Sequence, residues 1–241
     1  MEKLLKPLVG AFCAKAILSL DIKQQDCFKS FLSKLLGIGI VGGSSILKVP
    51  QIANMVQSQS SKGVSLASYV LETIGFIITL AYNYRLDNPF SSYGEGAFVT
   101  LQNAVVMLLI LRYTNKTGLL VVGAPLYAAL AVGLFWDQAT SMQTLALLQW
   151  GTILLGVASK LPQIYSNLRQ GSTGQLSAIT TFLQFAGTVA RVFTSVQEGL
   201  DAAILTSFAV MTLLNGILLA QIVYYRNETR SNRSKRSKKG V

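Results

Sequence analysis

Two lysines stand inside long apolar segments, each two positions before a proline-glutamine pair. The first stretch is Lys48-Val49-Pro50-Gln51, and the second, 112 positions later, is Lys160-Leu161-Pro162-Gln163. A charge in hydrocarbon needs a partner or a route to water. A proline inside a helix frees the carbonyl four residues back and bends the axis. We therefore predict a repeated polar site in two bent helices, with the kinks or hinges at Pro50 and Pro162.

Other polar side chains in the apolar segments extend this site. Three cations, Lys48, Lys160 and Arg191, stand there against one carboxylate, Glu72. A net-positive interior suits an anionic headgroup such as a sugar phosphodiester, which arginine holds through paired donors and lysine as a point charge. The predicted ligand-binding set is Lys48, Gln51, Glu72, Lys160, Gln163, Gln184, Arg191 and Asn215.

Each of these residues also has a purely structural interpretation. The lysines can extend toward the cytosolic face, although Lys48 lies about 12 Å from the end of its predicted span and a lysine stem covers about half of that. Glu72 and Arg191 can form a structural ion pair or lie at the interface. The prolines can be fixed kinks that shape a cavity instead of hinges.

Composition places the chain in a membrane. Its 241 residues are 51% hydrophobic and 13% charged, with a mean hydropathy of +0.47, unlike soluble domains. The formal net charge is +11, but seven of the 21 basic residues lie in the last sixteen positions, which indicates topology and targeting instead of nucleic-acid binding. We expect no metal or cofactor, since histidine is absent, and no enzyme, since we find no paired carboxylates or nucleophile–base arrangement.

Seven segments are apolar enough and about long enough to cross a bilayer, so we predict an all-α fold. An N-terminal tail, 1–34, precedes them, and a basic tail, 226–241, follows. The predicted spans are 35–56, 66–85, 96–113, 118–136, 142–168, 176–197 and 202–225.

Loop charges predict the orientation. Connections holding Lys62, Arg112 with Lys116, and Arg169 alternate with connections holding Asp87, Asp137 and Glu198. By the positive-inside rule the first group is cytosolic, together with the basic tail. Seven spans then place the N-terminus in the lumen, although its six lysines argue against this.

The two cysteines lie in the N-terminal tail. Cys13 and Cys27 would pair in an oxidising lumen and stay reduced in the cytosol, and both states remain open.

The same offset of 112 relates further residues. Ser65 matches Ser177, Leu71-Glu72 matches Leu183-Gln184, and Gly75 matches Gly187. We therefore predict two three-helix repeats, 35–113 and 142–225, joined by a linker helix at 118–136. An odd linker gives the two repeats the same orientation, so they are parallel.

The paired lysine-proline-glutamine stretches resemble those of the PQ-loop family, whose relatives include sugar transporters, a lysosomal cystine transporter and retrieval receptors. Further runs, at 36–44, 88–95, 173–180 and 190–198, resemble a family member that is needed for dolichol-phosphate-linked mannose and glucose to serve as lumenal sugar donors. This resemblance implies an endoplasmic reticulum membrane protein that supports N-glycan, GPI-anchor and related glycosylation. The resemblance does not specify the physical step, and it is the net-positive interior that leads us to predict that the chain binds dolichol-linked monosaccharide phosphates and moves or presents them in the membrane.

Two alternative functions remain open: an organiser of glycosyltransferases that transports nothing, and a carrier of a small solute.

The chain ends Lys238-Lys239-Gly240-Val241, with lysines three and four places from the terminus. This is the dilysine retrieval signal that coat machinery reads on a cytosolic tail. An ordinary basic tail that attracts anionic lipid is the competing interpretation.

Three glycosylation sequons test the orientation. Asn115, Asn227 and Asn232 all fall on the predicted cytosolic side, so we expect that glycosidase treatment leaves the electrophoretic mobility of the protein unchanged. Sugar on any one of them would overturn the orientation.

Overall fold

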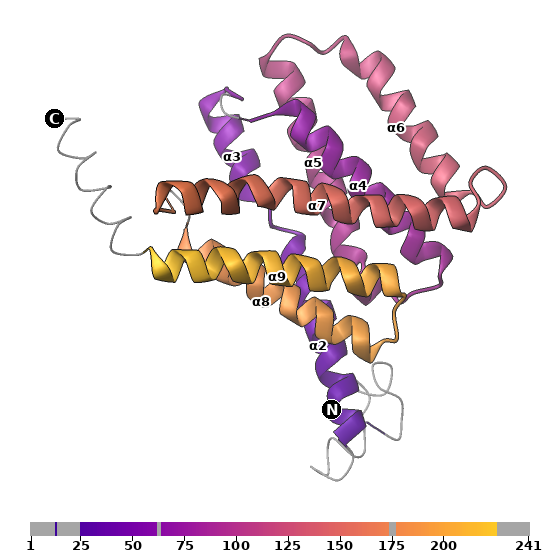
Figure 1. Ribbon diagram of the computed structural model, residues 1–241. Coiled ribbons are helices and arrows are strands. Elements are labelled where there is room, and N and C mark those ends of the chain that lie inside the picture. The colour runs from indigo at the N-terminus through magenta and orange to yellow at the C-terminus, as the bar shows by residue number, and fades with distance from the viewer. Residues whose placement is uncertain (1–12, 14–24, 62–63, 174–176, 226–241) are drawn as a thin grey trace. The chain divides into compact units, whose positions relative to one another are not determined.

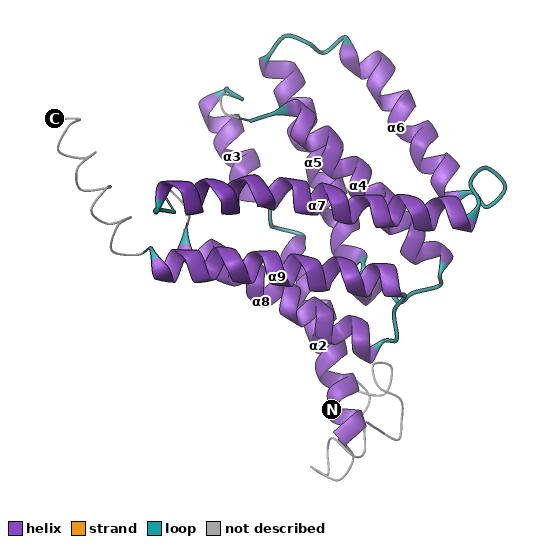
Figure 2. Ribbon diagram, viewed as in Figure 1, coloured by secondary structure: helices purple, strands orange, loops and turns teal. Residues whose placement is uncertain are grey.

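The computed structural model describes residues 13, 25–61, 64–173 and 177–225. Within these residues every regular element is a helix (Figures 1 and 2). They are α2 (Gln25–Ser44), α3 (Val49–Ser58), α4 (Leu66–Arg85), the short 3-10 helix η1 (Phe90–Ser92), α5 (Gly94–Tyr113), α6 (Leu119–Phe135), α7 (Met142–Gln170), α8 (Ala178–Gln197) and α9 (Ala202–Tyr224).

These helices form seven long segments when α2 and α3 are taken as one, as the all-α prediction requires. Among the described residues, five of the seven are long and apolar enough to cross a membrane: α2 with α3, α4, α5, α7 and α9. Two long segments remain. Helix α6 is apolar but has only 17 residues. Helix α8 carries Gln184 and Arg191 among its 20 residues, which lowers its hydropathy.

The first long segment begins earlier than the predicted span. Helix α2 starts at Gln25, where the sequence predicts a tail up to residue 34. Asp26 in the first turn favours a helix start because it complements the helix dipole, and it pairs with Lys29 at 3.5 Å. A bilayer-length criterion does not detect such an extension, because a helix can continue past the membrane.

Gly37 marks a close approach of α2 to the connection between α4 and α5. An added Cβ there would lie 3.0 Å from the backbone oxygen of Ser91, in η1. Helices α2 and α3 run beside α5, since Ser44 and Lys48 contact Gln102 and Met55 contacts Ile110 further on.

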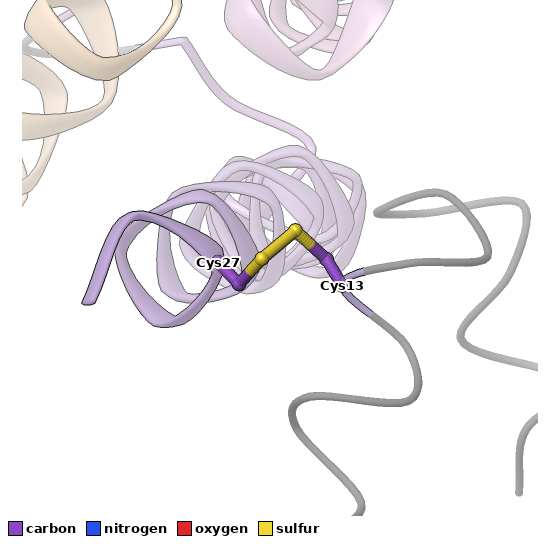
Figure 3. The surroundings of a disulfide bond; sticks show 2 residues. All are labelled: Cys13 and Cys27. Atoms are coloured by element: carbon purple, nitrogen blue, oxygen red, sulfur yellow. A yellow bond between two sulfur atoms is a disulfide. The ribbon is translucent and has the colours of Figure 1, made fainter. Parts of the chain in front are cut away.

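A disulfide joins Cys13 to Cys27 in the first turn of α2, with Cα atoms 5.1 Å apart (Figure 3). The sequence leaves the redox state of these cysteines open.

The two prolines have different positions in their helices, although they stand at matched positions of the repeat. Pro50 lies in the first turn of α3, after a turn that separates α3 from α2. Proline is favourable there because the amide it lacks has no partner within the helix anyway. The carbonyl of Ile46 is not left open, since it accepts from the amide of Val49 at 3.2 Å. Pro162, by contrast, lies inside the continuous α7.

A buried glutamine explains this difference. Gln102 of α5 accepts from the Lys48 amide at 2.7 Å and donates to the Ser44 carbonyl at 2.8 Å. It thereby gives the Lys48 amide an acceptor at the break between α2 and α3, and it gives the Ser44 carbonyl a second donor beside the Leu47 amide. The position 112 residues later is Leu214, which has no hydrogen-bonding group, so the second repeat has no equivalent brace for a broken helix.

The chain divides into two compact units, one up to Gln149 and one from Trp150 onward. In each unit the helix segment that follows the lysine packs on the third long helix of the repeat. In the first unit Met55 of α3 clusters with Val106 and Ile110 of α5. In the second, Ile164 of α7 clusters with Leu214 and Leu218 of α9.

The two units differ at two matched positions where the lysine-bearing segment meets the third long helix. In the second unit Asn167 donates to Gln221 at 2.9 Å, and Gln221 donates to the Ile164 carbonyl at 3.0 Å, all buried. The residues 112 positions earlier are Met55 and Leu109, which pack in the apolar cluster of the first unit. Two polar groups therefore replace two apolar ones together, as they must where an unpaired polar group is costly.

An ion pair ties the end of α4 to the connection between α6 and α7. Arg85 lies 2.6 Å from the Asp137 carboxylate and donates to the Thr140 carbonyl at 2.7 Å. The connections after α4 and after α6 therefore lie at the same end of the first unit. This agrees with the alternation of acidic and basic loops in the sequence.

The glutamine brace can be tested by making the first repeat like the second. We expect Gln102→Leu to speed hydrogen exchange at the Lys48 amide and to lower the free energy of unfolding by about 1–3 kcal/mol, because the part-buried Lys48 amide loses its acceptor and the Ser44 carbonyl keeps only the Leu47 amide. Exchange measured by mass spectrometry on the peptide that contains the break would show it. Conservative Leu214→Met is the matched control, and unchanged exchange in Gln102→Leu would contradict the brace.

Candidate functional site

Matched serine caps set the register of the two lysine sites. Ser65 caps α4 by accepting from the Ser68 amide, and Ser177 caps α8 by accepting from the Thr180 amide, each at 3.3 Å. Glu72 and Gln184 follow their caps by seven residues. They consequently lie at the same depth of the two helices, about 10 Å from the cap.

In the first unit the lysine meets a carboxylate. The Lys48 ammonium lies 2.7 Å from Glu72 Oε2 and 4.4 Å from the centre of the Tyr69 ring. Asn103 of α5 donates to the same carboxylate oxygen at 3.2 Å and to the Thr73 hydroxyl at 3.2 Å. The Lys48 side chain is 13% exposed and that of Glu72 is 40% exposed. The first site is thus a charge-balanced ion pair with its carboxylate held by two donors.

In the second unit the corresponding lysine meets a neutral amide. The Lys160 ammonium donates to Gln184 Oε1 at 3.0 Å. The two contacts are equivalent, because 24 residues separate the partners in both units. Within the described parts of the chain Lys160 forms no ion pair with a carboxylate. The second site therefore keeps a net positive charge.

The direction of the lysine side chains weighs against the interpretation that they only extend toward water. Each lysine ammonium group contacts a polar side chain of the next helix, about two helical turns after the serine cap of that helix. Lysines that extend to the interface keep the charged group in water, whereas Lys48 is largely enclosed.

The other predicted site residues are distributed less evenly. Gln51 joins the first site through Tyr69, whose hydroxyl donates to Gln51 Oε1 at 2.6 Å. Gln163 is half-buried in α7, and no hydrogen bond joins its side chain to the described residues. Arg191 is 3% exposed in α8, seven residues beyond Gln184, and Asn215 is 2% exposed in α9. The structure thus pairs Lys48 with Glu72 and Lys160 with Gln184. Gln51 is connected to the first pair through Tyr69.

Sequence reasoning missed three members of the first site: Tyr69, Thr73 and Asn103. One signal was present, because Asn103 and Asn215 are 112 positions apart. Both asparagines are buried, with a side-chain oxygen that has no hydrogen-bond partner among the described residues. Tyr69 and Thr73 correspond to Thr181 and Phe185, so the repeat gives no sign of them.

Other predictions fall outside the described residues. The dilysine signal at Lys238 and Lys239 is one of them, and so are the sequons at Asn227 and Asn232. The described residues contain no group of three metal-ligating side chains.

The fold and the site define a helical membrane protein built from two repeats, each with one lysine paired to the following helix. A model of the PQ loop repeat matches residues 32–92 and 144–204, two segments that are themselves 112 positions apart. The chain belongs to the PQ-loop repeat family and is a multi-pass membrane protein.

One relative is "Solute carrier family 66 member 3" of Homo sapiens, which is 27% identical over 195 residues, or 80% of this chain and 95% of the relative. No solved structure matches the chain.

The unequal pairs predict unequal stability effects. Lys48→Met should lower the free energy of unfolding by about 2 kcal/mol, because it leaves the half-exposed Glu72 carboxylate without its cation. Adding Glu72→Gln should recover much of this loss. Lys160→Met, the matched control, leaves only a neutral amide and should cost less than about 1 kcal/mol. Unfolding in bicelles would measure all three, and equal losses for the two lysines would contradict the ion-pair assignment.

Proposed function

We propose that the protein binds the phosphosugar headgroup of dolichol-phosphate-mannose and dolichol-phosphate-glucose and moves or presents these lipids for use as lumenal donors. The observation that carries this proposal is the pair of lysine contacts at matched depth in the two units. With Arg191, the residues within the long helices carry more cations than carboxylates. A sugar phosphodiester supplies the negative charge and the hydroxyl groups that such cations and amides would bind.

The sequence resemblance supports the choice of ligand. The runs at 36–44, 88–95, 173–180 and 190–198 resemble those of the mannose-P-dolichol utilization defect 1 protein, which serves N-glycan, GPI-anchor and other mannosylation. These runs are spread over the first and second units, so the resemblance does not depend on the repeat motif alone. The role is one of binding and transfer between leaflets or partners, not of catalysis.

The same proposal places the protein in the endoplasmic reticulum, with its C-terminus in the cytosol. The Cys13–Cys27 disulfide supports a lumenal N-terminus. The terminal Lys238 and Lys239 support retrieval from later compartments by coat machinery. With seven spans, the two termini then lie on opposite sides.

A second candidate function is transport of a small soluble solute, favoured by the name of the relative in solute carrier family 66. A third is organisation of dolichol-dependent glycosyltransferases without any transport. A carrier of a soluble solute would not change the rate of lipid movement between leaflets. An organiser would affect glycosylation only when the glycosyltransferases are present.

Reconstitution separates these functions. Liposomes containing the purified protein should move a short-chain dolichyl-phosphomannose analogue between leaflets at least about tenfold faster than protein-free liposomes, since the interior cations lower the barrier for the headgroup. The rate would be read by oxidation of the exposed sugar. If transfer is not accelerated while Lys48 and Lys160 substitutions still abolish lumenal mannosylation in cells, the protein is an organiser.

A further inference from the structure

The two lysine sites differ in the groups that they leave available to a ligand. In the first unit Glu72, which can only accept, receives hydrogen bonds from Lys48 and Asn103. In the second unit Lys160 can only donate, so the Gln184 oxygen must face it. This leaves four donors, two N–H groups of the Gln184 amide and two of the Lys160 ammonium, against one remaining lone pair of the Gln184 oxygen.

A donor-rich site with one positive charge favours an oxyanion. A hydroxyl or neutral sugar would gain hydrogen bonds there but would leave the charge uncompensated, which is costly away from water. The first site already contains its own anion, so a ligand phosphate would have to displace Glu72 from Lys48. The Gln184 side chain is exposed on α8, and a ligand can therefore reach the second site without displacing a protein group.

We infer that the second repeat alone holds the anionic group of the ligand, through Lys160 and Gln184, while the Lys48–Glu72 pair neutralises itself and holds no anion. This assignment rests on the proposed function, because it names which half of the protein binds the phosphodiester. The distinguishing residue is a single amide-for-carboxylate difference between matched positions, Gln184 and Glu72.

Exchanging these two residues tests the assignment in the full-length protein in lipid nanodiscs. Native mass spectrometry would measure affinity and stoichiometry with citronellyl phosphomannose, with neutral citronellyl mannoside and with soluble mannose 1-phosphate. Gln184→Glu should raise the Kd for the phosphomannose at least about tenfold, because it neutralises Lys160. Binding of the neutral mannoside should change much less.

Glu72→Gln should create a second donor-rich, positively charged site and raise the stoichiometry from about one to about two phosphomannose molecules per chain. The double exchange Glu72→Gln with Gln184→Glu should restore binding, now at Lys48. The matched control is Gln197→Glu on the same helix, which adds the same charge about 20 Å further along α8 and should leave the Kd unchanged.

Three outcomes would overturn parts of the scheme separately. An unchanged Kd in Gln184→Glu, or a larger loss in Lys48→Gln than in Lys160→Gln, overturns the assignment to the second repeat. Equal binding of phosphomannose and neutral mannoside by the wild type overturns the proposed function itself. Equal binding of mannose 1-phosphate keeps the Lys160 site but makes its ligand a soluble anion.

Discussion

The structure depends on one constraint: a lysine placed well inside an apolar helix must be given a polar partner. Both repeats meet it in the same way, with a residue 24 positions later on the next helix. The serine caps at Ser65 and Ser177 start that helix at the same point in both repeats and so bring the partner to the depth of the lysine. The short connection between the lysine-bearing helix and the serine-capped helix therefore brings the lysine and its polar partner to the same level.

The same constraint explains how the repeats diverged. A polar group that cannot reach water is tolerated only with a partner, so polar and apolar residues are exchanged in sets. Gln102 accompanies a broken helix, whereas Leu214 accompanies a continuous one. Asn167 and Gln221 bond to each other where Met55 and Leu109 pack by apolar contact. Each unit therefore has one buried polar brace, and the two braces join different parts of the lysine helix to the third helix.

This divergence changes the charge of the two sites and not only their packing. Glu72 makes the first site neutral, and Gln184 leaves the second site positive. The two proline-containing segments also differ in continuity, since α3 is separated from α2 while α7 runs through Pro162. A mechanism that treats the two halves as interchangeable is therefore inconsistent with the chemistry of the chain.

The sequence by itself determined the membrane class, the repeat, its offset and the start and end of most helices, because long apolar segments and matched residues are properties of the chain alone. It also located Lys48, Glu72, Lys160 and Gln184. Only the tertiary structure decided that Glu72 and Gln184 are the partners, that Tyr69 and Asn103 complete the first site, and that Pro50 begins a helix while Pro162 lies within one. These features depend on which side chains meet between helices, and a periodic apolar pattern does not specify that.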